Sequence, residues 1–97
     1  MNDLPRLSNI EHEILELLRS GEKYGLEMVR ASAVLKRGTV YVTLDRMMAK
    51  GFVTSRAIRN PNEPGMARRV YSITALGQRV LRARQAAEAA FALGAPA

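Results

Sequence analysis

The stretch of sequence that decides the fold covers residues 34–59 and reads VLKRGTVYVTLDRMMAKGFVTSRAIR. Its centre predicts a helix from about Thr39 to Lys50, because apolar residues recur there at helical spacing. Gly51 is a natural stop for this helix. From Phe52 to Arg59 the pattern changes to β-branched, aromatic and arginine residues, which favour a strand. The stretch therefore predicts a turn, a helix and a strand in direct succession.

The predicted helix over residues 39–50 has two distinct faces when its residues are placed about 100° apart. The apolar face comprises Val40, Leu44, Met47 and Met48, with Tyr41 at its margin. The opposite face comprises Thr39, Val42, Thr43, Arg46 and Lys50. We expect the first face to pack in the core and the second to remain accessible.

Two helices are predicted before this stretch. Ser8 and Glu11 form a capping box, so the first helix is expected from about residue 8 to residue 20, where Ser20 and Gly21 end it. A shorter helix should follow from about Tyr24 to Ala33. Residues 34–38 then break the pattern and are few enough to force the second and third helices into a tight turn.

A hairpin and a last helix are predicted after the stretch. A second strand is expected over 68–73, with Tyr71 and Ile73 facing the core, and residues 60–67 contain Asn-Pro and Pro-Gly turn pairs. Thr74 can cap a helix to about Leu93, followed by a frayed tail. The predicted fold is mainly α with a small β-hairpin: a winged helix-turn-helix of three helices, a two-stranded wing and a C-terminal helix. We expect residues 1–73 to bind DNA and residues 74–97 to dimerise.

Composition fits a single soluble domain with a basic surface. The 97 residues are 47% hydrophobic and 25% charged, they include no cysteine, and the net charge is +6. Residues 1–35 carry four basic and six acidic side chains, whereas residues 36–97 carry eleven basic and three acidic ones. This asymmetry favours a polyanionic partner, although basic residues can also serve solubility. The chain has neither a secretory signal pattern nor an apolar run of about 18 residues, so a cytoplasmic location without a membrane partner is expected.

The chain also resembles the PadR family of bacterial regulators over roughly residues 7–82. The residues that carry the resemblance are Leu7-Ser8, Glu11, Ile14-Leu15, Lys23-Tyr24-Gly25-Leu26-Glu27, Gly38-Thr39-Val40-Tyr41, Leu44, Arg46, Lys50-Gly51-Phe52-Val53, Arg69, Tyr71 and Thr74-Ala75-Leu76-Gly77. The resemblance implies a dimeric repressor whose third helix enters the major groove and whose wing touches the backbone. It also implies an effector, which in some members is a phenolic or other aromatic compound. Val42 departs from the proline common in the family, and the chain ends soon after its fourth helix, which leaves less protein for an effector pocket.

The candidate DNA-binding residues lie on the third helix and the hairpin. They are Lys36, Arg37, Thr39, Tyr41, Val42, Thr43, Arg46, Arg59, Arg68 and Arg69. Those at the start of the helix suit phosphate, and those on its outward face suit base edges. The hairpin arginines suit the backbone or the minor groove, Arg56 less than the others. The alternatives are an ordinary solvated turn and helix face, a purely structural Tyr41, and a charged strand edge that prevents aggregation.

The last helix carries a narrow apolar seam, which predicts a homodimer interface. Its members are Leu76, Val80, Ala83, Ala87 and Ala90, with Phe91 available to cover the end. The alternative function is a winged-helix protein-interaction module that docks through this seam. We expect no enzyme, cofactor or metal: the single histidine, His12, has no ligand cluster or catalytic partners around it, and it is expected to be a surface or boundary residue of the first helix.

Overall fold

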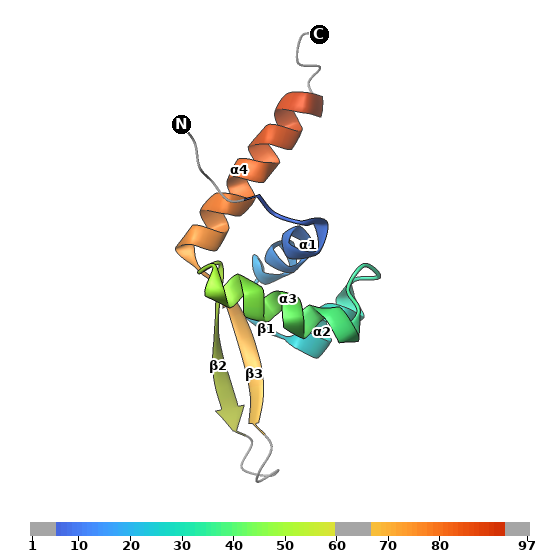
Figure 1. Cartoon of the computed structure of the whole chain (residues 1–97), viewed down its shortest axis with the longest axis vertical. Coiled ribbons are helices and arrows are strands. Elements are labelled where there is room, and N and C mark those ends of the chain that lie inside the picture. The colour runs from blue at the N-terminus through green and yellow to red at the C-terminus, as the bar shows by residue number, and fades with distance from the viewer. Residues whose placement is uncertain (1–5, 60–66, 93–97) are drawn as a thin grey trace.

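The computed structural model describes residues 6–59 and 67–92 (Figure 1). Its elements are α1 (Asn9–Leu18), β1 (Lys23–Tyr24), α2 (Gly25–Ala31), α3 (Arg37–Ala49), β2 (Val53–Arg59), β3 (Ala67–Ile73) and α4 (Ala75–Ala92). This is the predicted winged helix-turn-helix, mainly helical with a small wing. The predicted turn over residues 60–67 and the predicted tail lie almost entirely outside the described residues. None of the helices in the described ranges is long and apolar enough to cross a membrane.

The ends of α1 and α3 follow from their capping residues. The Ser8 hydroxyl accepts from the Glu11 N–H at 3.1 Å and the Glu11 carboxylate accepts from the Ser8 N–H at 2.9 Å, which confirms the predicted capping box. The helix α3 begins two residues earlier than predicted, because the carbonyl of Lys36 already accepts from the Val40 N–H at 2.9 Å. At the other end Gly51 adopts a φ of +83°, a conformation that glycine tolerates best, and closes the helix.

The sheet has three strands, one more than the sequence predicts. Strands β2 and β3 form the antiparallel wing, with Val53 opposite Ile73 and Arg59 opposite Ala67. The additional strand β1 pairs with β3 on its other side, so the order is β1-β3-β2. Only Lys23 and Tyr24 form β1, and a two-residue strand has no periodicity that a sequence pattern could reveal.

The core lies where α1, α3, the wing and the first half of α4 meet. Its fully buried side chains include Ile14, Leu15, Leu18, Met28, Val40, Leu44, Met47, Phe52, Val80 and Leu81. Tyr71 is buried and Ile73 packs against this cluster, as predicted, but the adjacent Val70 is buried as well, so the strand does not alternate strictly. The apolar face of α3 therefore faces inward, and its opposite face is left for solvent or a partner.

The start of α4 is joined tightly to the wing. The Thr74 hydroxyl accepts from the Gly77 N–H at 2.9 Å and donates to the Gly51 carbonyl at 2.6 Å, so Thr74 caps the helix as predicted. Gly77 is buried, and a Cβ there would lie 2.2 Å from the Phe52 carbonyl oxygen. Only glycine allows so close an approach of the helix to the backbone before β2.

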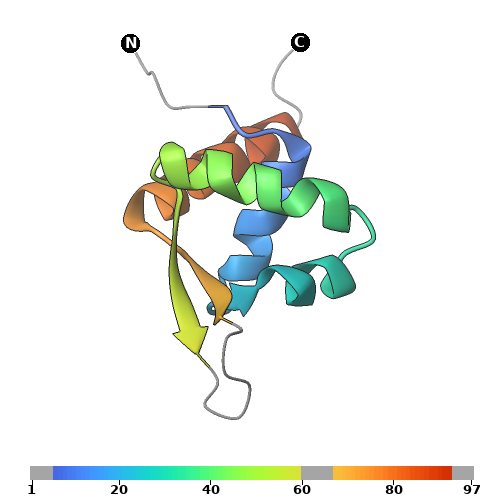
Figure 2. The same cartoon turned by 60° about the horizontal axis from the view of Figure 1, so that its bottom comes forward.

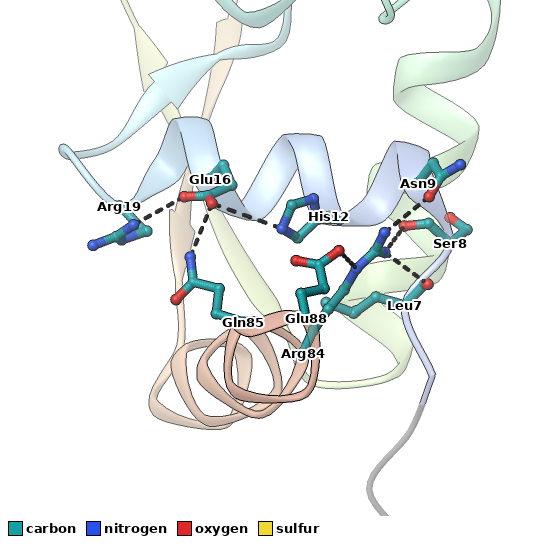
Figure 3. A network of polar contacts seen from close by, with 9 residues as sticks. All are labelled: Leu7, Ser8, Asn9, His12, Glu16, Arg19, Arg84, Gln85 and Glu88. Carbon is teal, nitrogen blue, oxygen red and sulfur yellow. Dashed lines mark hydrogen bonds and ion pairs between the residues drawn. The ribbon is translucent and has the colours of Figure 1, made fainter. Parts of the chain in front are cut away.

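A polar network holds the middle of α4 against α1 (Figure 3). The Arg84 guanidinium donates to the carbonyls of Leu7 and Ser8 at 3.0 and 3.2 Å and to the Asn9 side chain at 2.9 Å. Its Nε also donates to Glu88 at 3.3 Å within α4. The second half of α4 then extends away from the wing with every residue from Ala86 to Ala92 exposed (Figure 1).

Candidate nucleic-acid interface

The exposed face of α3 presents most of the side chains predicted to read DNA. Val42 is 51% exposed, and Arg46 and Thr39 are also exposed. Thr43 is half-buried, and its hydroxyl donates to the Thr39 carbonyl at 2.9 Å, which leaves the oxygen free to accept. The structure also exposes Asp45 and Ala49 on this side of the helix. Both residues lie opposite Val40, Leu44 and Met47 in a helical projection, but neither was among the predicted DNA-binding residues.

The start of α3 concentrates positive charge. Lys36 is the N-cap residue, Arg37 and Gly38 form the first turn, and all three are exposed. No acidic residue lies in this turn. Unpaired backbone N–H groups and the helix dipole favour an anion at such a position. The site therefore has the electrostatic character that the sequence predicts for phosphate contact.

Lys50, at the far end of α3, is engaged within the fold. Its Nζ lies 2.7 Å from a carboxylate oxygen of Glu11, which is buried, and 5.8 Å from the centre of the Phe52 ring. Burial would raise the pKa of Glu11, but the hydrogen bonds from Lys50 and Ser8 outweigh it and lower that pKa below its ordinary value. This ion pair connects the C-terminal end of α3 to α1.

Tyr41 is both packed and accessible. Its side chain lies against Gly25, where a Cβ would come within 2.6 Å of the ring and 2.9 Å of the hydroxyl oxygen. The residue nevertheless remains 40% exposed. The sequence left open a structural or a binding role, and this geometry accommodates both.

The arginines of the wing differ in their surroundings. The Arg68 guanidinium lies 5.7 Å from the centre of the Tyr24 ring, and Arg69 donates to the Ser55 hydroxyl at 3.0 Å. Arg56 forms an ion pair with Glu22 at 2.6 Å, which neutralises its charge. Arg59 is exposed at the end of β2.

Two hollows flank α3 and gather the candidate residues into two groups. One, of about 520 Å³, is lined mainly by the start of α1, the turn before α3, and the side chains of Lys36, Thr39, Thr43, Arg46 and Lys50. The other, of about 190 Å³, lies between α2, α3 and β3, and its lining includes Tyr41, Arg68 and Arg69. Figure 2 shows α2 and the wing on the same side of α3. The exposed Val42 lies outside both hollows, on the part of α3 between them, which we call the ridge. Arg37 and Arg59 also lie outside both hollows.

The residues of the predicted dimer seam fall into two environments. Val80 is only 2% exposed and belongs to the core of the protomer, and Leu76 packs against that core. Ala83 is half-buried, whereas Ala87 and Ala90 are exposed. Phe91, at 81%, is the most exposed large hydrophobic residue of the described ranges. An interface on α4 can therefore use only the later part of the seam.

His12 lies at the boundary between α1 and α4, as predicted (Figure 3). Its Nε2 is buried without a hydrogen-bond partner and lies 3.7 Å from the Glu16 carboxylate. Glu16 in turn accepts from Arg19 at 3.0 Å and from Gln85 at 2.9 Å. Within residues 6–59 and 67–92, no three His, Asp or Glu side chains are grouped as metal ligands.

This arrangement of a helix-turn-helix, a basic wing and an exposed third helix defines a winged helix DNA-binding fold. A model of the Transcriptional regulator PadR-like family matches residues 14–83, and the chain belongs to that family. The resemblance noted in the sequence is thus confirmed.

Solved structures of the same family superimpose well. The chain is 29% identical to a PadR family transcription regulator from Clostridium difficile R20291, with a TM-score of 0.70 over 80% of this chain and 84% of that one. A PadR family regulator from Eggerthella lenta DSM 2243 is 25% identical, with a TM-score of 0.74 over 88% and 76% of the two chains. Bacillus subtilis PadR in complex with operator DNA shares the fold at 22% identity, with a TM-score of 0.75 over 82% of this chain and 48% of that one. No curated protein sequence matches the chain.

Proposed function

We propose that the chain is a sequence-specific transcriptional repressor that binds a palindromic operator as a homodimer in the cytoplasm. The observation that carries the proposal is the exposed face of α3, which presents Val42 on a ridge between two hollows with basic linings and Arg46 at the edge of that ridge, in the lining of one hollow. An α-helix of about 10–12 Å diameter fits a major groove about 12 Å wide. Side chains on the ridge can then reach base edges while the flanks meet the backbone.

The chemistry of the ridge suits base reading. An arginine can donate two hydrogen bonds to guanine, so Arg46 is the main candidate for direct readout. The methyl groups of Val42 and the threonines can contact thymine. Lys36, Arg37 and the wing arginines are assigned to phosphates, which position the protein without selecting a sequence. The operator complex of Bacillus subtilis PadR supports this docking by similarity of fold alone.

Dimerisation through the later part of α4 follows from the size of one winged helix. A single recognition helix contacts few base pairs, so two copies on a palindrome are the usual solution. Ala87, Ala90 and Phe91 are exposed and apolar, and small alanine side chains allow two helices to approach closely. Burying Phe91 against a second copy removes a large aromatic side chain from water.

The test is selection of bound sequences from a random DNA pool, followed by affinity measurements at several salt concentrations. A palindromic consensus is expected. If the dimer neutralises roughly 8 phosphates, log affinity should fall against log salt with a slope near −7. A slope near zero, or weak retention on heparin that salt does not change, would favour the interaction-module alternative.

Replacing Arg46 with Ala should weaken binding to the selected site by about 1–3 kcal/mol and relax the choice of base at one position per half-site. Replacing Arg69 with Ala should instead weaken all sequences about equally, because a phosphate contact carries no sequence information. Repeating the selection with both variants separates the two roles. If Arg46→Ala and substitutions of Val42 and Thr43 all leave the consensus unchanged, readout lies outside α3.

A further inference from the structure

The hollow between α2, α3 and β3 has a lining that sequence reasoning did not assemble. Besides the wing arginines Arg68 and Arg69 and the side chain of Tyr41, it includes Arg30 and Tyr24 from the region of α2. Its volume of about 190 Å³ is several times the roughly 30 Å³ that one water molecule occupies in the liquid. The hollow can therefore hold a small polar group.

The charge in this hollow is positive. Three arginines, Arg30, Arg68 and Arg69, line it, against one acidic residue, Glu27. The Glu27 carboxylate is already engaged, because it accepts from the Tyr24 N–H at 2.7 Å. Guanidinium groups with a planar fork of donors are the side chains best suited to phosphate oxygens.

The lining is held in place by contacts within the fold. Arg68 lies over the Tyr24 ring, and Arg69 is bound to Ser55 on the neighbouring strand. The Tyr41 hydroxyl lies beside Gly25, and any larger residue at position 25 would displace it. Arg30, Tyr41 and the two wing arginines thus come from three separate elements and line one hollow.

We propose that this hollow binds one backbone phosphate of the DNA in each protomer, with Arg30 as a contact residue alongside Arg68, Arg69 and Tyr41. The inference rests on the proposed function and adds a specific phosphate site to it. A helix about as wide as the major groove brings its two flanks close to the two phosphate backbones. The hollow lies on one such flank, away from the ridge that carries Val42. Its ligand is accordingly a phosphodiester and not a base edge.

The decisive variant is Arg30→Gln in the full chain, with Arg79→Gln as the matched control. Both remove one exposed arginine, but Arg79 lies on α4, outside the hollow and outside the residues assigned to DNA contact. Arg30→Gln should lower affinity about tenfold per half-site for every sequence and make the salt slope of the dimer shallower by about 2, because each protomer loses one phosphate contact worth about 1. Arg79→Gln should change affinity less than about twofold, because it removes no phosphate contact. Thermal unfolding by circular dichroism checks that both variants fold, and Arg30→Lys should restore the slope.

A second measurement locates the phosphate. Each phosphate of the selected duplex is replaced in turn by a neutral methylphosphonate, and binding of the wild type and of Arg30→Gln is compared. Replacing one phosphate per half-site should weaken binding of the wild type but not of Arg30→Gln, because the variant has already lost the contact with that phosphate. Equal effects of Arg30→Gln and Arg79→Gln on DNA that the wild type binds would overturn the phosphate site. A changed consensus would do the same, since it would assign Arg30 to a base.

Two further results distinguish a failure of the phosphate site from a failure of the proposed function, and a DNA phosphate from a free anion. Failure of the wild type to bind any duplex would overturn the proposed function itself. Inorganic phosphate, titrated against the protein alone at constant ionic strength, tests the other source of the same chemistry. Saturable binding that Arg30→Gln abolishes, with DNA affinity unchanged, would assign the hollow to a free anion and overturn the backbone-phosphate assignment.

Discussion

The two halves of α4 share one apolar spacing but lie in different environments. In the first half, Val80 is buried in the core and Leu76 packs against it. In the second half, Ala87 and Ala90 continue the same seam at a spacing of three residues and are exposed, as is Phe91. The spacing identifies which face of the helix is apolar. What covers that face depends on whether another element lies beside it.

The boundary between the halves lies where α1 stops supporting α4. Arg84 donates to carbonyls just before α1, and Gln85 donates to Glu16 near its end (Figure 3). Beyond these contacts the helix continues without burying any of its described residues. The first half should therefore contribute to the stability of the protomer, and the second half to assembly.

The largest expected effect on folding is that of Leu81→Ala. Leu81 is almost fully buried, so its truncation removes apolar contacts and leaves a cavity. The free energy of unfolding should fall by about 2–5 kcal/mol. Urea unfolding followed by circular dichroism measures it. A loss below 0.5 kcal/mol (about the effect of a surface change) would mean that the first half of α4 is not part of the core.

Gly77→Ala should be the next most harmful change. The added Cβ would meet the backbone carbonyl of Phe52, which cannot move aside like the end of a flexible side chain. The separation of α4 from β2 would have to increase, and the free energy of unfolding should fall by about 1–3 kcal/mol despite the better helix propensity of alanine. Ala75→Gly, at an exposed position two residues earlier, provides a measure of helix propensity alone. Equal stability of Gly77→Ala and the wild type would show that the approach is not tight.

Glu16 accepts a hydrogen bond from Gln85 at the end of the first half of α4. It should make a small, pH-dependent contribution to the free energy of unfolding. Its pKa is lowered, mainly by the hydrogen bond from Arg19, against a smaller effect of burial and with help from Gln85. Because folding lowers the pKa of Glu16, its contribution to the free energy of unfolding is fully present at pH values above the ordinary pKa of 4.5. The contribution is lost as the pH falls through the lowered pKa of the folded state. Because the side chain is one-third exposed, solvent screens the interaction and well under 1 kcal/mol is expected.

The measurement is urea unfolding of the wild type and Glu16→Gln at pH 7 and near pH 3. The difference between the two proteins should shrink at the lower pH, because protonation of Glu16 removes the charge that its partners stabilise. Glu11, whose pKa is also lowered, remains in both proteins and serves as the internal reference. If the two proteins differ in free energy of unfolding by the same amount at both pH values, Glu16 does not contribute to the acid sensitivity of the fold.

Ala87→Glu should have the smallest effect on the protomer and a specific effect on assembly. Ala87 is exposed, so the free energy of unfolding should change by less than about 0.5 kcal/mol at concentrations where the protein is monomeric. A charge buried at a helix-helix interface is unfavourable, so the dimer and its operator affinity should be lost. Sedimentation and circular dichroism test both halves of this expectation. A variant that stays dimeric would place the interface elsewhere.

The fold could be predicted largely from local signals. The capping box of Ser8 and Glu11, the stop at Gly51 and the cap at Thr74 are each satisfied by nearby residues, so a short sequence pattern contains the necessary information. The apolar face of α3 was also predictable, because helical geometry alone separates it from the exposed face. The start of α3 and the strand β1 were less accessible, since they depend on backbone pairing that few residues specify.

For the candidate site, the sequence by itself determined the apolar face of α3 and that the wing is basic, because helical period and charge are properties of the chain. Only the tertiary structure decided which residues of α3 and of the wing form ion pairs within the fold and which line a hollow. It pairs Lys50 with Glu11 and Arg56 with Glu22, and it brings Arg30 and Tyr41 into one hollow with Arg68. It likewise divides the seam of α4 between core and solvent. Such outcomes depend on contacts between residues far apart in the sequence, and no local pattern records which residues the fold brings together.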